Sequence, residues 1–101
     1  MRGVLTLVAA ALVLAACGEN GSPVGRGKQV YLAQCVACHN SNPSKDGPVG
    51  PAIKGALPEL LEAKLLRGTY PPGYAPKRNT AIMPLQPQFA AHISDLAAFL
   101  R

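Results

Sequence analysis

The motif C-x-x-C-H at residues 35–39 brings together the side chains best suited to chemistry. Residues three positions apart lie on one face of a helical turn. Cys35 and Cys38 can therefore each form a thioether with one of the two vinyl groups of a haem, as in c-type haem attachment. His39 follows directly, so its imidazole can bind the haem iron as the proximal ligand. The pattern predicts one covalently bound haem c.

Two other chemistries also use paired cysteines. A thioredoxin-like redox disulfide is expected beside a βαβ pattern, and nothing near the motif indicates one. A structural zinc site needs four ligands, and His92 is the only histidine besides His39. Two cysteines with an adjacent histidine close such a site poorly, which favours haem.

Met83 is the candidate for the ligand on the other side of the iron. A thioether sulfur is a soft ligand suited to haem iron. Met83 lies in the proline-rich stretch 70–86, which is predicted to be a loop, and the only other methionine is Met1. A methionine that fills a gap in the core is the alternative. His92 competes as sixth ligand, but it lies in a predicted helix, from which reaching the iron is harder.

The loop after the motif must support the ligating histidine. Residues 40–51 are rich in Asn, Ser, Gly and Pro, which predicts a loop. A ligating histidine normally donates its second ring N–H to a backbone carbonyl, which fixes the tautomer. Pro51 is a good candidate, because proline stiffens the loop and adds no competing N–H.

Residues 1–16 have the pattern of an export signal. A short positive start is followed by an almost unbroken apolar run over residues 4–16, too short to span a membrane. The run ends Leu-Ala-Ala-Cys at Cys17, which resembles the bacterial lipobox, where a diacylglyceryl group is attached to the cysteine. An ordinary cleavage site with a stray cysteine is the alternative. A free exposed thiol is a liability in an exported protein, so lipidation of Cys17 is favoured.

This leader predicts the domain organisation and the location. Residues 17–25 are rich in Gly, Ser and Asn and are expected to form a flexible lipidated tether. One domain is expected over residues 26–101, since the 101 residues allow one domain at most. The protein is predicted to be exported and held by lipid in the periplasm or at the outer face of the cell membrane.

Three helices are predicted, at about residues 26–35, 58–67 and 87–101. In the second, Pro58 suits the first helical position and Gly68 the position just past the end. The third carries one apolar stripe, formed by Phe89, Ile93, Leu96 and Leu100. Glycine is costly inside a helix, so Gly27 in the first helix predicts the close approach of another helix. The second helix is predicted to serve packing only.

Taken together, these elements resemble class I cytochrome c over roughly residues 25–101. The matching segments are Gly-Lys-Gln-Val-Tyr (27–31), the haem motif (35–39), Gly-Pro-Ala-Ile (50–53), Ile-Met-Pro (82–84) and Asp-Leu-Ala-Ala-Phe-Leu (95–100). The resemblance implies an all-α, small cytochrome c fold, with three to four helices and long loops wrapped around one covalently attached haem. It also implies that the first and last helices cross near Gly27, with Leu96 and Phe99 at the contact.

The resemblance further implies roles around the haem. The Pro51 carbonyl would hold His39, and Tyr31 and Ile53 would line the packing around the haem. The loop from residue 70 to 79 has no counterpart in the family pattern. Which residue there bonds the Met83 sulfur or a haem propionate stays open among Tyr70, Tyr74, Asn79 and Thr80.

These features predict an electron carrier whose haem iron cycles between Fe(III) and Fe(II). Ligation by His39 and Met83 gives a comparatively high potential, which suits transfer between respiratory-chain partners. The alternative is a haem c subunit or electron-entry domain of a larger dehydrogenase or oxidase. A haem peroxidase or gas sensor needs an open sixth coordination position on the iron. Ligation by Met83 would fill that position, which disfavours both alternatives. The chain is therefore expected to be an electron carrier, alone or as a subunit of an oxidoreductase complex, and not an enzyme by itself.

The formal net charge of +5 bears on the choice of partner. Export and haem favour redox proteins over nucleic acid, and the chain is expected to be a monomer. Five cations flank the haem motif and the Met83 segment: Lys28, Lys45, Lys54, Lys77 and Arg78. In the family these segments frame the exposed haem edge, so the partner is expected to offer an acidic docking surface. A dispersed, solvated set of charges is the alternative.

Overall fold

The computed structural model describes residues 21–101. The predicted signal peptide, Cys17 and most of the predicted tether lie outside the described residues. The elements are α1 (Pro23–Gln34), α2 (Pro58–Glu62), the π-helical η2 (Ala63–Arg67), the 3-10 helix η3 (Pro87–His92) and α3 (Ile93–Leu100). This part of the chain contains no strand, so the all-α prediction is confirmed.

Helix α1 begins at Pro23, three residues before the predicted start at residue 26. The Ser22 hydroxyl accepts a hydrogen bond from the Gly25 N–H at 3.0 Å, and Pro23 occupies the first helical position. Both features stabilise a helix start. The prediction that the tether extends to Gly25 is therefore wrong, because residues 23–25 already belong to the helix and Gly25 is buried.

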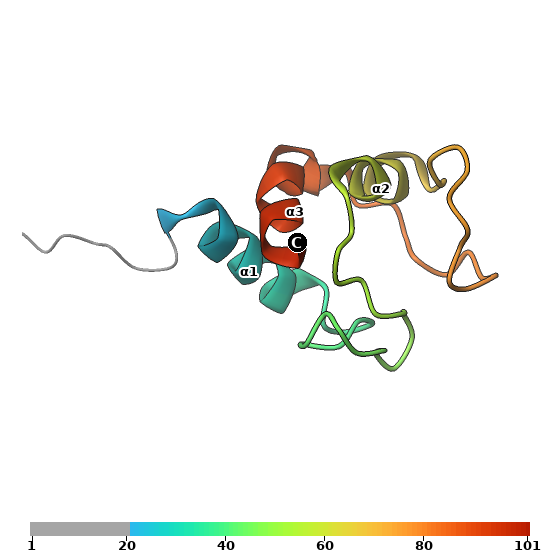
Figure 1. Ribbon diagram of the computed structural model, residues 1–101, viewed down its shortest axis with the longest axis horizontal. Coiled ribbons are helices and arrows are strands. Elements are labelled where there is room, and N and C mark those ends of the chain that lie inside the picture. The colour runs from blue at the N-terminus through green and yellow to red at the C-terminus, as the bar shows by residue number, and fades with distance from the viewer. Residues whose placement is uncertain (1–20) are drawn as a thin grey trace, which may run out of the picture.

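Helices α1 and α3 cross at Gly27, where the backbones come into direct contact (Figure 1). A Cβ added to Gly27 would overlap the carbonyl group of Asp95 and lie 3.0 Å from the Leu96 nitrogen. Beside this contact, the Arg26 guanidinium donates to both carboxylate oxygens of Asp95, at 2.9 and 3.1 Å. The hydrogen bond from Arg26 lowers the pKa of Asp95, so the carboxylate stays ionised at the crossing.

Tyr31 and Leu100 lie at the centre of the core and are almost completely buried. The Tyr31 ring contacts the Phe99 ring with 5.4 Å between centroids. Its hydroxyl donates to the backbone carbonyl of Asn40, so burial leaves no unpaired polar atom on this side chain. The predicted apolar stripe of the last helix lies in the same cluster, since Phe89 and Leu96 are also buried.

Two of the predicted helices depart from regular α geometry. Residues 63–67 continue α2 as a π-helix, in which backbone bonds span one residue more per turn. Gly68 then ends the helix with a φ of 65°, in the left-handed region that glycine adopts without strain. The last helix begins as the 3-10 turn of residues 87–92 and becomes α-helical only at Ile93.

The long loops gather at one side of the molecule. In Figure 1, α1 starts at the left of the domain, whereas the loops before α2 and after η2 extend to the right of the α1–α3 crossing. Over residues 21–101, no helix combines the length and the hydropathy needed to cross a membrane.

Candidate functional site

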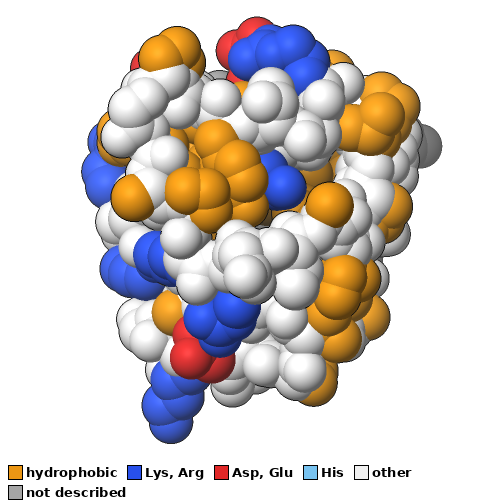
Figure 2. All heavy atoms as spheres, turned by 90° about the vertical axis from the view of Figure 1, so that its right-hand side faces the viewer, with side chains coloured by type: hydrophobic (Ala, Val, Ile, Leu, Met, Phe, Trp, Pro, Cys, Tyr) orange, Lys and Arg blue, Asp and Glu red, His pale blue; other side chains and the backbone are white. Residues whose placement is uncertain are grey.

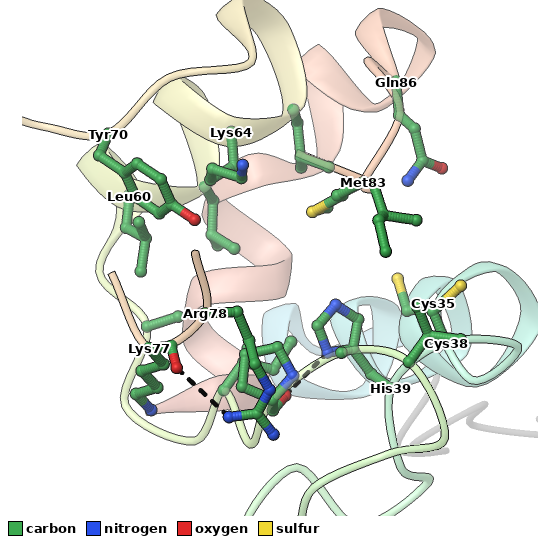
Figure 3. Close-up of a pocket in the computed structure, with 18 of the residues that line it drawn as sticks. Cys35, Cys38, His39, Leu60, Lys64, Tyr70, Lys77, Arg78, Met83 and Gln86 are labelled. Atoms are coloured by element: carbon green, nitrogen blue, oxygen red, sulfur yellow. Dashed lines mark hydrogen bonds between the residues drawn. The ribbon is translucent and has the colours of Figure 1, made fainter. Parts of the chain in front are cut away.

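A cavity of about 530 Å³ lies between the haem-motif turn, α2 and the loop that follows η2. Cys35, Cys38 and His39 form part of one wall, and Met83 belongs to another. Figure 3 shows the three motif residues below and to the right of the cavity and Met83 above them. The four predicted attachment and ligand residues therefore share one cavity.

His39 is oriented by the loop that follows it. Its ring atom Nδ1 lies 2.9 Å from the carbonyl oxygen of Pro51, as the resemblance implied. Gly50 lies against the ring face, because a Cβ there would be 2.5 Å from Cε1 and 2.7 Å from Nδ1. With Nδ1 donating to Pro51, Nε2 is the bare nitrogen and can bind a metal. The imidazole points into the cavity, toward the wall that carries Met83 (Figure 3).

The two cysteines lie on a tight turn directly after α1. The His39 N–H donates to the Cys35 carbonyl at 2.9 Å, and the Cys38 N–H donates to the same oxygen at 3.3 Å. Both are free thiols and both line the cavity. Burial raises the pKa of the Cys35 thiol. The turn thus presents two separate thiols and one imidazole to the same space.

Met83 and His92 differ in their access to this cavity. Met83 is partly buried, packs against the hydrophobic core and lines the cavity. His92 is not among the lining residues, and its ring contacts the Phe89 ring with 6.4 Å between centroids. The geometry therefore favours Met83 over His92 as the partner of His39 across the cavity.

The cytochrome c family model matches residues 24–101. The chain belongs to the cytochrome c family. The comparison with curated proteins returned no match. Membership in the family implies covalently bound haem c, and it indicates a haem-based electron carrier rather than an enzyme.

The residues of this cytochrome fit the haem that the family implies. The cavity walls are mainly apolar, as the macrocycle requires, and they combine two free thiols with a bare imidazole nitrogen and a thioether. The close approach of Gly50 and the contact of Nδ1 with Pro51 hold the His39 ring beside the cavity. Hard oxygen ligands are not needed for such a site, because iron in haem is held by nitrogen and sulfur donors.

Tyr31 and Ile53 were both expected beside the haem, and the structure separates them. Ile53 lines the cavity. Tyr31 does not line the cavity. It is fully buried between α1 and α3, where its ring contacts the Phe99 ring. The expectation for Tyr31 is corrected on this point, because its aromatic ring fills the helix crossing.

Helix α2 contributes more to the cytochrome cavity than the packing role predicted for it. Leu60 and Leu61 of α2 line the cavity, together with Leu57 directly before α2 and Lys64 of η2, which continues the same helix. Their spacings of three and four place them on one face of the helix, a signal that was present in the sequence. The prediction of a packing helix is therefore incomplete, since the same face covers the core and the cavity.

Two tyrosines of the loop after η2 stand at the cavity edge. Tyr70 and Tyr74 stack with 5.4 Å between ring centroids and 8° between planes. The Lys64 ammonium lies 4.4 Å from the Tyr70 centroid, a cation–π contact. Thr80 also lines the cavity, but Asn79 does not. Three of the four loop residues left open by the sequence are thus within reach of a bound haem.

The five cations expected near the haem edge divide into two groups. Lys54, Lys77 and Arg78 line the cavity, together with Lys64 from η2. Lys28 and Lys45 are not among the lining residues. Figure 2 shows the side of the molecule that carries the long loops, where basic side chains surround an apolar patch.

Proposed function

We propose that this cytochrome carries single electrons between respiratory-chain partners through one haem c. Cys35 and Cys38 would attach the haem, and His39 and Met83 would hold its iron. The observation that carries this proposal is the placement of the His39 imidazole, fixed through Nδ1 to Pro51 at 2.9 Å, across one cavity from the Met83 sulfur. The bound haem supplies an iron centre that gains or loses one electron.

The chain's own residues determine how well that centre works. The hydrogen bond to Pro51 keeps His39 in one tautomer and raises its basicity as a ligand. Leu60 and Leu61 of α2 and Ile53 give the cavity wall an apolar surface, which would limit the access of water to a bound haem. If His39 and Met83 both held the iron, small molecules would have no open coordination site, which would separate a carrier from a peroxidase or sensor.

Covalent attachment is tested by extraction with acidified acetone. The purified protein is expected to keep its colour on the polypeptide. The double variant Cys35→Ser with Cys38→Ser is expected to release its haem into the solvent, because no thioether can form. Cys17→Ser is the matched control and should retain the colour. Free haem from the unaltered protein would contradict the proposal.

The docking partner is proposed to be a redox protein with an acidic surface. Support comes from Lys54, Lys64, Lys77 and Arg78 around the apolar cavity walls, with Glu59 as the acidic residue among the lining side chains. Complementary charge steers association and raises its rate at low salt. Apolar groups at the centre of such a surface, including the exposed Ile82, would supply contact area once the partner has docked.

Docking by charge predicts a strong dependence of the rate on salt. The second-order rate of electron transfer to an isolated acidic oxidase fragment should fall about tenfold or more as salt rises from 0.01 to 0.5 M, since the Debye length shrinks from about 30 to below 8 Å. Lys54→Glu with Lys64→Glu should reduce the low-salt rate, whereas Lys28→Glu with Lys45→Glu, an equal charge change away from the cavity, should reduce it less. Stopped-flow measurements of this rate for the two double variants across salt concentrations test the prediction. A rate that stays flat with salt would remove the electrostatic part of the proposal.

Membrane anchoring through lipid on Cys17 is proposed from the lipobox-like sequence alone. A diacylglyceryl group supplies two acyl chains, which is what stable anchoring requires. Cys17→Ser, expressed with its own leader, should move from the membrane fraction to the soluble periplasm or the medium. Retention of this variant in the membrane fraction would show that something other than the lipid holds the protein.

A further inference from the structure

The segment that carries Met83 has few polar ties to the rest of the molecule. Over residues 75–85 the backbone makes no backbone hydrogen bond to any other segment within the described range of 21–101. The next backbone hydrogen bond to another segment is made by Gln86, whose N–H donates to the Leu65 carbonyl at 2.7 Å. The position of Met83 therefore depends on side-chain contacts.

Two adjacent side chains of this segment supply such contacts. The Lys77 Nζ donates to the backbone carbonyl of Ala52 at 2.7 Å. The Arg78 Nη2 lies 3.3 Å from the Asp46 Oδ2. Figure 3 shows Lys77 and Arg78 at the side of the cavity away from Cys35 and Cys38. Both contacts cross from the Met83 segment to the loop that follows the haem motif.

The receiving loop is the one that orients His39. The other carboxylate oxygen of Asp46 accepts the Ala52 N–H at 2.8 Å, and the Asn40 side-chain amide donates to the Asp46 carbonyl at 3.2 Å. Ala52 directly follows Pro51, whose carbonyl oxygen contacts His39. The hydrogen bond from Ala52 and the pairing with Arg78 lower the pKa of Asp46, so its carboxylate is available to Arg78.

We propose that Lys77 and Arg78 form a latch that ties the Met83 segment to Ala52 and Asp46. The latch joins the segment that carries Met83 to the loop that orients His39. Lys77 and Arg78 are positioning residues in this role, because they act on the iron site through Met83. The inference rests on the proposed ligation by Met83 for its effect at the iron, although the latch itself is defined by the contacts of the two loops.

Exposed ion pairs contribute little to global stability. Local opening of a loop, however, requires only the free energy that holds that loop. Loss of one latch contact should therefore raise the open population of the Met83 segment about two- to fivefold. Such a change is too small to unfold the domain and large enough to measure as a rate.

The test compares four variants of the full haem-loaded protein: Lys77→Gln, Arg78→Gln, Asp46→Asn and the double variant Arg78→Gln with Asp46→Asn. The rate of CO binding to the reduced protein reports how often Met83 leaves the iron. Each single variant should bind CO about two- to fivefold faster. The double variant should resemble its single parents, because both changes remove the same contact.

Arg67→Gln is the matched control, since Arg67 forms a comparable exposed ion pair with Glu62 at 3.0 Å that does not cross to another loop. Its CO rate should be unchanged. Peptide-resolved hydrogen exchange over residues 75–85 provides a second measurement that does not depend on Met83 ligation. Exchange there should be faster in the latch variants and unchanged in the control.

The outcomes separate the latch from its rivals. If Arg78→Gln accelerates CO binding but Asp46→Asn does not, Arg78 acts on the haem carboxylates and the latch is overturned. Unchanged hydrogen exchange in all latch variants overturns it as well. If the unaltered protein lacks a sulfur-to-iron charge-transfer band while the variants still exchange faster, the proposed ligation fails and the latch between the loops stands.

Discussion

Met83→Ala is expected to open the sixth coordination position of the iron. The sulfur-to-iron charge-transfer band should disappear, and CO should bind the reduced protein at least a hundredfold faster, because no protein ligand must first dissociate. The reduction potential should fall by on the order of a few tenths of a volt, since methionine ligation favours the reduced iron. An absorption spectrum, a CO-binding time course and a redox titration measure the three effects.

His92→Ala is the control for this experiment. His92 does not line the cavity and contacts Phe89 instead, so its removal should leave the spectrum and CO binding unchanged. The opposite pattern, with CO binding unchanged in Met83→Ala and accelerated in His92→Ala, would transfer the role of second iron ligand to His92. The core around residue 83 would then have to rearrange on haem binding.

Gly27→Ala is expected to destabilise the folded protein by about 3 kcal/mol or more, at the upper end of overpacking costs. The new Cβ would overlap the Asp95 carbonyl, and backbone cannot move aside as a flexible side chain can. The helices would have to separate, which would also disturb the Arg26–Asp95 pair and the Tyr31–Phe99 contact. Denaturant unfolding of the haem-loaded protein measures the change.

Helix propensity sharpens the interpretation of this substitution. Alanine in place of glycine normally favours a helix by about 0.5–1 kcal/mol. A loss of stability can therefore only come from the crossing with α3. Gln29→Ala, at an exposed position of the same helix, is the control and should change stability by at most about 0.5 kcal/mol. A more stable Gly27→Ala protein would contradict the close contact.

Much of the site could be predicted because its residues are local in sequence. Cys35, Cys38 and His39 act within one turn, and their spacing carries their chemistry. Gly27 was informative for a similar reason, since a glycine inside a helix points to a close neighbour even when that neighbour is unknown. Pro51 could be proposed because a ligating histidine needs a nearby carbonyl.

The rest depended on contacts between distant parts of the chain. Tyr31 has a ring that suits either a cavity wall or a helix crossing, and only the position of Phe99 on α3 decides between them. The pairing of Arg78 with Asp46 joins two loops without regular structure, which no periodicity predicts. The early start of α1 was hidden because Gly, Ser and Pro suit both a tether and a capped helix.

The end at which the chain enters the domain governs how the molecule would stand on a membrane. Of α1, only its last residue, Gln34, lines the cavity, and the helix starts on the far side of the domain (Figure 1). Arg26 also donates to the Gly21 carbonyl at 2.8 Å, which holds the incoming chain to that far end. From Cys17 to Gly21 a chain can reach at most about 14 Å, less than the roughly 18 Å length of the 12-residue α1. With lipid on Cys17, so short a connection would not let the domain rotate until its cavity end faced the membrane. The haem edge would face the aqueous phase, so electrons would be exchanged with proteins arriving from above the lipid surface.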